Sequence, residues 1–337
     1  MRNIVKTLVM ALAIAGVTAG VAQAADYKPR IIRFGYGLAD DSNQGRAVKF
    51  FADDLAKRTG GKLKAKGFAN ASLGSDVQMQ NALIGGAQEM MVGSTATLVG
   101  IVKGFGVYDL PFLFANEQEA DSVLDGPFGQ KLAASLQEKG LVGLVYWENG
   151  FRNLTNTKRP ITRLEDMQGI KLRVMQNPVY IDMFNSFGAN AVPLPFSELF
   201  TALETKTVDG QENPVNTIQS SKFYEVQKYL SITKHVYSPW IVIASKKWWD
   251  GLSADEKKAL RESALASRNF ERKDSREAAT RAVEYLKSKG GMQVSVVSDK
   301  EIGRMRDKAL PAYMKFAADG GAEVVKDVQA ELARLRK

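Results

Sequence analysis

Two arginines stand in or beside segments that predict buried strands, and their chemistry points to anion binding. Arg173 lies inside the apolar segment 170–174, and Arg152 follows the apolar segment 141–147 and a short polar stretch. A buried guanidinium without a partner is unfavourable. Its planar fork matches a carboxylate through two parallel hydrogen bonds. Arg173 therefore pairs with either an acidic ligand or an internal carboxylate, and the pattern alone leaves both open.

Asn213 stands where a predicted strand, which begins at residues 207–210, enters the segment Gln-Glu-Asn-Pro at 211–214. Ligand sites in α/β sheets lie at strand ends, so Asn213 is a candidate ligand contact. The alternative is an ordinary Asn-Pro turn.

Residues that could support catalysis are scarce. The chain has no cysteine and one histidine, His235, which excludes a thiol nucleophile, a thiolate metal site and a histidine-rich metal centre. No catalytic or nucleotide-binding motif is present, and the acidic pairs are typical of helix faces and caps. We therefore expect a protein that is not an enzyme and that holds no cofactor or metal.

The composition is that of an ordinary globular protein. With 337 residues, 45% of them hydrophobic and 25% charged, the chain suits about two domains of roughly 100–200 residues each. The net charge of +9 is dispersed, without the long basic run of a nucleic-acid-binding arm. The excess of positive charge is compatible with an anionic small ligand, or it serves only to keep the protein soluble.

The first 24 residues predict a secretory signal peptide. Arg2 and Lys6 precede the apolar stretch 8–17, and Ala22-Gln-Ala24 is an A-x-A cleavage site. We expect cleavage after Ala24 and a periplasmic mature protein; an uncleaved membrane anchor is the alternative.

Alternating strand and helix patterns predict an α/β fold with a largely parallel sheet. The pattern occurs twice, which fits two lobes joined by strands at a hinge. The first series comprises predicted strands 31–36, 62–68, 89–92 and 141–147 with helices 45–59, 76–84 and 128–139. The second comprises strands 170–174, 191–194, 207–210 and 237–245 with helices 178–187 and 197–204.

A helical pattern of unusual length follows. It begins at the capping box Ser253-Ala-Asp-Glu256 and extends to residue 289, with a polar middle at 271–277. Either one helix bridges both lobes, or two shorter helices meet at a break near Asp274.

Several ordered segments resemble the DctP-like family of solute-binding proteins of TRAP transporters. The strongest is Pro195-Phe-Ser-Glu-Leu-Phe-Thr-Ala-Leu-Glu-Thr-Lys-Thr-Val-Asp-Gly-Gln-Glu-Asn-Pro214. The others are residues 73–76, 110–114, 150–155, 169–174 and 222–229. The resemblance covers essentially the whole mature chain.

The resemblance implies a two-lobed periplasmic binding protein of α/β class, with hinge strands and one long interlobe helix. We expect residues 25–149 plus 239–274 to form lobe I and residues 150–238 plus 275–337 to form lobe II, with the ligand cleft between them. The protein is expected to capture a small organic acid by cleft closure and to deliver it to the small and large membrane subunits of a sodium-coupled TRAP transporter.

The resemblance also assigns ligand contacts. Arg173 would grip the ligand carboxylate, Arg152 would be a second anion contact, Asn213 would bind the ligand or the arginine, and Phe196 would pack on the ligand. By position, the cleft would also include Asn43, Ser94, Glu148 and Trp240. A C4-dicarboxylate or related acid is the leading expectation for the ligand. A sugar acid, another carboxylate or a role as a ligand sensor remain alternatives, and we expect a monomer.

Overall fold

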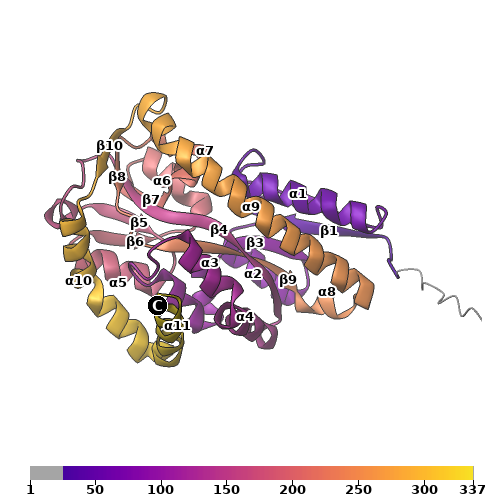
Figure 1. The fold of residues 1–337 in the computed structure, drawn as a ribbon. Coiled ribbons are helices and arrows are strands. Elements are labelled where there is room, and N and C mark those ends of the chain that lie inside the picture. Colours follow the sequence, from indigo (N-terminus) through magenta and orange to yellow (C-terminus); the bar gives the residue numbers. More distant parts are fainter. Residues whose placement is uncertain (1–25, 337) are drawn as a thin grey trace, which may run out of the picture.

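The computed structural model describes residues 26–336, so the predicted signal peptide lies outside it. Within this range the fold is α/β, as expected, with helices packed around a central sheet (Figure 1). None of the described helices combines the length and the apolar content that a membrane crossing requires.

The first half of the sheet begins with three parallel strands. These are β1 (Arg30–Gly35), β2 (Leu63–Phe68) and β3 (Met90–Ser94), linked by helices α1 (Asn43–Arg58) and α2 (Asp76–Gly85). Each helix begins at a serine cap, Ser42 or Ser75, whose hydroxyl accepts a backbone N–H. The bounds of these five elements lie within a few residues of the predicted ones.

The second half repeats this arrangement with β5 in the centre. The parallel strands are β5 (Lys171–Val174), β6 (Asn190–Pro193) and β7 (Gly210–Pro214), with helices α5 (Pro178–Ser186), α6 (Leu199–Glu204) and α7 (Val215–Ser220). Two further strands were not predicted, β8 (Tyr229–Ile232) and β10 (Gln293–Val296); β8 pairs with both β4 and β10.

Two long strands connect the halves and correct the expectation of a largely parallel sheet. β4 (Leu141–Asn156) and β9 (Tyr237–Ser245) pair antiparallel with each other, and β9 also pairs antiparallel with β3. Beyond Phe151, β4 leaves β9 and pairs antiparallel with β7 and β8. β4 thus belongs to both halves, and its register shifts between Glu148 and Gly150, where the halves join.

The long helix is continuous. α9 spans Ala254–Ser288 and packs against α1, β4 and α7, so it contacts both halves of the fold (Figure 1). Its capping box at Ser253 and Glu256 forms as predicted. The alternative of two helices with a break near Asp274 is wrong.

The other helices cover the lower part of the molecule in Figure 1. They are α3 (Glu117–Asp125), α4 (Pro127–Ala134), α8 (Lys246–Asp250), α10 (Asp299–Phe316) and α11 (Ala322–Leu335). α10 packs on α5, whereas α11 packs on α3 and on the 3₁₀ segment Lys103–Asp109. The C-terminal residues therefore touch elements of both predicted lobes, and the lobe boundaries stay predictions.

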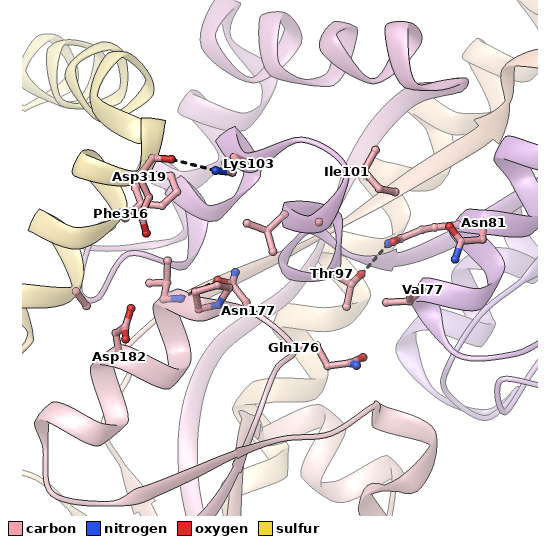
Figure 2. A pocket seen from close by; sticks show the side chains of 16 residues that line it. Val77, Asn81, Thr97, Ile101, Lys103, Gln176, Asn177, Asp182, Phe316 and Asp319 are labelled. Atoms are coloured by element: carbon pink, nitrogen blue, oxygen red, sulfur yellow. Dashed lines mark hydrogen bonds between the residues drawn. The ribbon is translucent and has the colours of Figure 1, made fainter.

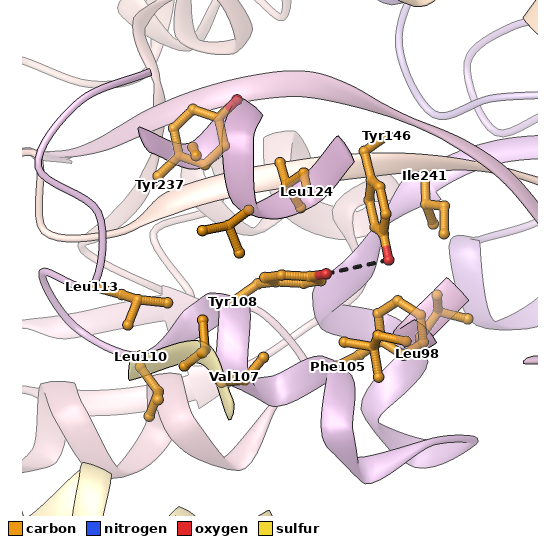
Figure 3. Close-up of a cluster of buried hydrophobic side chains, with 14 of the residues drawn as sticks. Leu98, Phe105, Val107, Tyr108, Leu110, Leu113, Leu124, Tyr146, Tyr237 and Ile241 are labelled. Carbon is orange, nitrogen blue, oxygen red and sulfur yellow. Dashed lines mark hydrogen bonds between the residues drawn. The ribbon is translucent and has the colours of Figure 1, made fainter. Parts of the chain in front are cut away.

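A cluster of buried side chains beside β4 and β9 forms one core of the first half (Figure 3). Its polar members are satisfied internally, because the Tyr108 hydroxyl donates to Tyr146, which donates to the carbonyl of Gly129. Burial of large aromatic side chains of this kind is worth several kcal/mol in total (~2 each).

Gly210 marks the start of β7 and is needed for close approach. A Cβ at this position would lie 2.2 Å from the carbonyl oxygen of Thr155 and 2.8 Å from the Cβ of Asn156 on β4. We therefore predict that Gly210→Ala lowers the free energy of unfolding by about 2 kcal/mol or more, as overpacking does. Urea denaturation measures the change.

Gly303 provides the matched control for this prediction. It lies inside α10 with open space around its missing Cβ. Gly303→Ala should stabilise the protein by about 0.5–1 kcal/mol through helix propensity. Equal effects of the two substitutions would contradict the proposed contact between β7 and β4.

Candidate functional site

A small polar cavity of about 40 Å³ lies where the two halves of the fold meet. Its wall is drawn from β3, β9, the N-terminus of α2, the hinge region of β4, β7 and the residue after β5. The lining residues are Gly37, Leu38, Gln44, Asp76, Ser94, Asn149, Met175, Phe196, Asn213, Thr217 and Trp240. Four of the eight predicted ligand contacts are among them.

Sheet register brings together Ser94 and Trp240, the predicted contacts from the first half. The two residues are direct partners across β3 and β9. The backbone N–H of Ser94 donates to Asp76 Oδ2 at 2.9 Å, which fixes that carboxylate at the cavity wall. Burial raises the pKa of Asp76 to about 6, opposed by this N–H and by the positive charge of Arg173.

Asn213 and Phe196 line the cavity from the second half. The Asn213 side-chain amide donates to Gln211 Oε1 on the same strand. Phe196 packs on Phe223, with ring centroids 6.0 Å apart. Both residues therefore have fixed positions at the wall, and their contact with a ligand stays a prediction.

Arg173 does not itself line the cavity but lies directly behind the lining residue Met175, and its charge has no ion pair among residues 26–336. Nε and one terminal nitrogen donate to the carbonyl of Leu194, at 2.9 and 2.6 Å. The other terminal nitrogen contacts only the sulfur of the cavity residue Met175, at 3.8 Å. Burial lowers the pKa of Arg173 to about 10, although the negative charges of Glu212 and Asp76 oppose the shift. The guanidinium is therefore still protonated at neutral pH.

Arg152 has a different environment. Its guanidinium forms a fully buried ion pair with Glu212, which also accepts a bond from His235 Nε2 at 3.0 Å. Burial opposes ionisation of Glu212, but Arg152 and His235 outweigh it and hold its pKa below the usual range. Arg152 does not line the cavity. Its ligand contact stays a prediction, and the geometry favours a structural role.

The two remaining predicted contacts surround α9 instead. Asn43 donates to Ser275 Oγ at 3.1 Å, and Glu148 accepts from Arg276 at 2.6 and 2.8 Å. Asn43 and Glu148 line two other cavities, of about 490 and 440 Å³. The structure thus places them at the hinge and outside the small polar cavity.

The sequence analysis missed several lining residues, and Asp76 is the most important. It belongs to a segment that resembles the family, but an acidic residue after a serine is typical of a helix start, so it carried no ligand signal. Gln44, Asn149 and Thr217 were missed because isolated amides and hydroxyls have no sequence signature. Thr217 donates to Asn149 at 3.1 Å across the cavity wall.

A larger cavity of about 570 Å³ lies between α2, α5 and the end of α10 (Figure 2). Two of its three charged side chains have partners, since Asp182 pairs with Lys315 and Lys103 donates to the backbone carbonyl of Asp319. None of the eight predicted contacts lines it. The small polar cavity beside Arg173 is therefore the better candidate.

Comparison with known proteins shows the family of the chain. Residues 34–319 match the profile of DctP, the bacterial extracellular solute-binding protein family 7. The chain belongs to this family. It also shares the two-lobed α/β fold of solved family structures, which confirms the predicted fold class.

The ligands named for three relatives are all organic acids. The sugar acid binding protein DctPAm of Advenella mimigardefordensis, solved with galactonate, is 53% identical with a TM-score of 0.90, covering 92% of this chain and 99% of its own. The 2,3-diketo-L-gulonate-binding periplasmic protein YiaO of Escherichia coli is 39% identical over 87% of this chain and 88% of its own. A TRAP periplasmic solute-binding protein of Sulfurospirillum deleyianum with bound succinate is 30% identical, with a TM-score of 0.85, over 90% and 99%.

The buried pair of Arg152 and Glu212 yields a stability prediction. Glu212→Gln leaves the guanidinium of Arg152 buried without its counter-charge, which should lower the free energy of unfolding by about 3–5 kcal/mol. Lys49→Ala, which breaks an exposed pair with Asp53, should change it by less than about 1 kcal/mol. Urea unfolding of both variants tests this. Equally small changes in the two variants would contradict the stabilising role of the pair between Arg152 and Glu212 and would favour Arg152 as an anion contact.

Proposed function

We propose that this protein captures a small organic acid in the periplasm and delivers it to the membrane subunits of a TRAP transporter. The observation that supports this most directly is Arg173, a buried cation with no carboxylate partner among residues 26–336, beside a polar cavity at the junction of the two halves. A ligand carboxylate would supply the missing counter-charge. Family membership supports binding and delivery rather than catalysis.

Binding by closure of the two lobes follows from the cavity wall. The wall is shared between the halves, so a ligand in it contacts both and favours their closed arrangement. Closure excludes water, which strengthens the attraction between Arg173 and the carboxylate. We retain the predicted lobe boundaries, periplasmic location, sodium-coupled transport and monomeric state within this proposal.

For the ligand we favour a sugar acid over the C4-dicarboxylate that led the sequence analysis. The relative solved with galactonate is 53% identical, whereas the one solved with succinate is 30% identical. The cavity wall also offers amides and hydroxyls that suit a polyhydroxy chain, namely Gln44, Ser94, Asn149, Asn213 and Thr217.

The carboxylate clamp is tested with Arg173 variants. We expect Arg173→Ala to lose acid binding by at least about a hundredfold, the scale of a charge-assisted bidentate pair. Arg173→Lys should also bind poorly because a point charge does not reproduce the fork. Lys171→Ala, at an exposed position of the same strand, is the control and should bind as the wild type. Wild-type affinity in Arg173→Ala, measured by calorimetry, would contradict the proposal.

The ligand class is tested by thermal shift. A ligand that binds the folded state raises Tm by mass action. We expect galactonate and gluconate to raise the Tm of the dialysed protein more than succinate or malate at equal concentration. A larger shift with succinate would favour the C4-dicarboxylate alternative.

A further inference from the structure

Asp76 is the only titratable side chain among the described residues that line the polar cavity. It opens α2, and the capping box of Ser75 and Gln78 fixes the first turn of that helix. Its Oδ2 is held by the N–H of Ser94, whereas Oδ1 accepts no hydrogen bond from residues 26–336. That second oxygen lies on the side of Gly37, another residue of the wall.

The wall and its surroundings carry charge of both signs. Arg173 supplies a positive charge from β5, and Asp76 supplies a negative charge from α2, close enough to influence each other's ionisation. The next carboxylate, Glu212, is paired with Arg152 and His235. The site therefore has one unpaired cation, which a single ligand carboxylate neutralises.

We propose that Asp76 is a specificity residue, which accepts a hydrogen bond from a ligand hydroxyl and rejects acids that carry a second carboxylate. This inference rests on the proposed capture of an acid at Arg173. An ionised carboxylate only accepts hydrogen bonds, so its partner must be a donor such as a hydroxyl. A second ligand carboxylate would have no cation to pair with and would face a like charge in a buried site, which is strongly unfavourable.

In this role, Asp76 distinguishes organic acids by chemical class. Polyhydroxy monocarboxylates satisfy both charged groups at once: their carboxylate pairs with Arg173 and a hydroxyl donates to Asp76. A dicarboxylate of the same chain length keeps its other hydroxyls, but its second carboxylate finds no unpaired cation in the site and faces the like charge of Asp76. Asp76 thus gives a physical reason, independent of the relatives, for a site that prefers sugar acids with one carboxylate.

Galactonate and galactarate form a matched ligand pair, because they differ only in the oxidation of the far carbon. By calorimetry at pH 7.5, we expect the wild type to bind galactonate at least tenfold more tightly than galactarate. Asp76→Asn keeps an oxygen for the N–H of Ser94 but removes the charge, so this preference should fall by at least tenfold. Asp76→Glu keeps the charge and should retain the preference, even if both acids bind more weakly.

A pH series on the wild type tests the same idea without a variant, and it decides the matter if Asp76→Asn does not fold. Arg173, whose pKa is about 10, is protonated throughout, and the neutral Ser94 is the other group that contacts the carboxylate. Because the pKa of Asp76 is about 6, its charge is present at pH 8 and mostly absent at pH 5. The preference for galactonate should therefore be smaller at pH 5 than at pH 8.

Each outcome has one meaning. A preference that is unchanged in Asp76→Asn, or an equal loss of both acids, would overturn the specificity role. Tighter binding of galactarate by the wild type would also overturn it while leaving acid capture at Arg173 intact. Failure of the wild type to bind any acid would instead defeat the proposed function.

Discussion

The site depends on one buried positive charge that the protein does not neutralise. Arg152 comes from β4 and Arg173 from β5, the two strands on either side of β7, and both arginines are buried. Arg152 has its counter-charge in Glu212, whereas Arg173 has two hydrogen bonds to one backbone carbonyl and no ion pair among the described residues. Since an uncompensated guanidinium is costly to bury, the fold holds Arg173 in a state that an anion improves. The arrangement of the strands thus holds an unpaired positive charge where a bound anion stabilises it.

The rest of the fold keeps that charge at the junction of the two halves. β4 is shared by both halves, and α9 packs along them on one side. Ser275 of α9 contacts Asn43 on α1, Asn216 on α7 and the carbonyl of Glu148 on β4. The polar middle of the helix therefore lies at the hinge, where it forms hydrogen bonds with the part of β4 at which the register shifts. Hydrogen bonds of this kind can be rearranged at less expense than a packed apolar contact when the halves move.

The sequence was sufficient for the alternating elements of both halves, because their periodicities and serine or glycine boundaries are local. It was not sufficient for the path of β4 beyond Trp147, where polar residues hide a strand that gains its partners from β7 and β8. The helical pattern alone also left the continuity of α9 undecided, and only the family resemblance favoured one helix, since the polar middle is explained by packing against the hinge. The distinction between Arg152 and Arg173 depends on Glu212, which is distant in sequence from both, and no local pattern carries that information.

The walls of the cavity connect the site to the hinge. The cavity of about 40 Å³ exceeds the ~10–15 Å³ that one water molecule needs, and both halves of the fold line it. The strands and helix that carry the walls meet at Glu148–Gly150 and Ser275. A ligand that contacts both walls holds the lobes at one particular separation. The site then distinguishes acids by both chain length and charge pattern. An acid that is too short reaches only one wall, and an acid with a second negative charge opposes closure of the lobes.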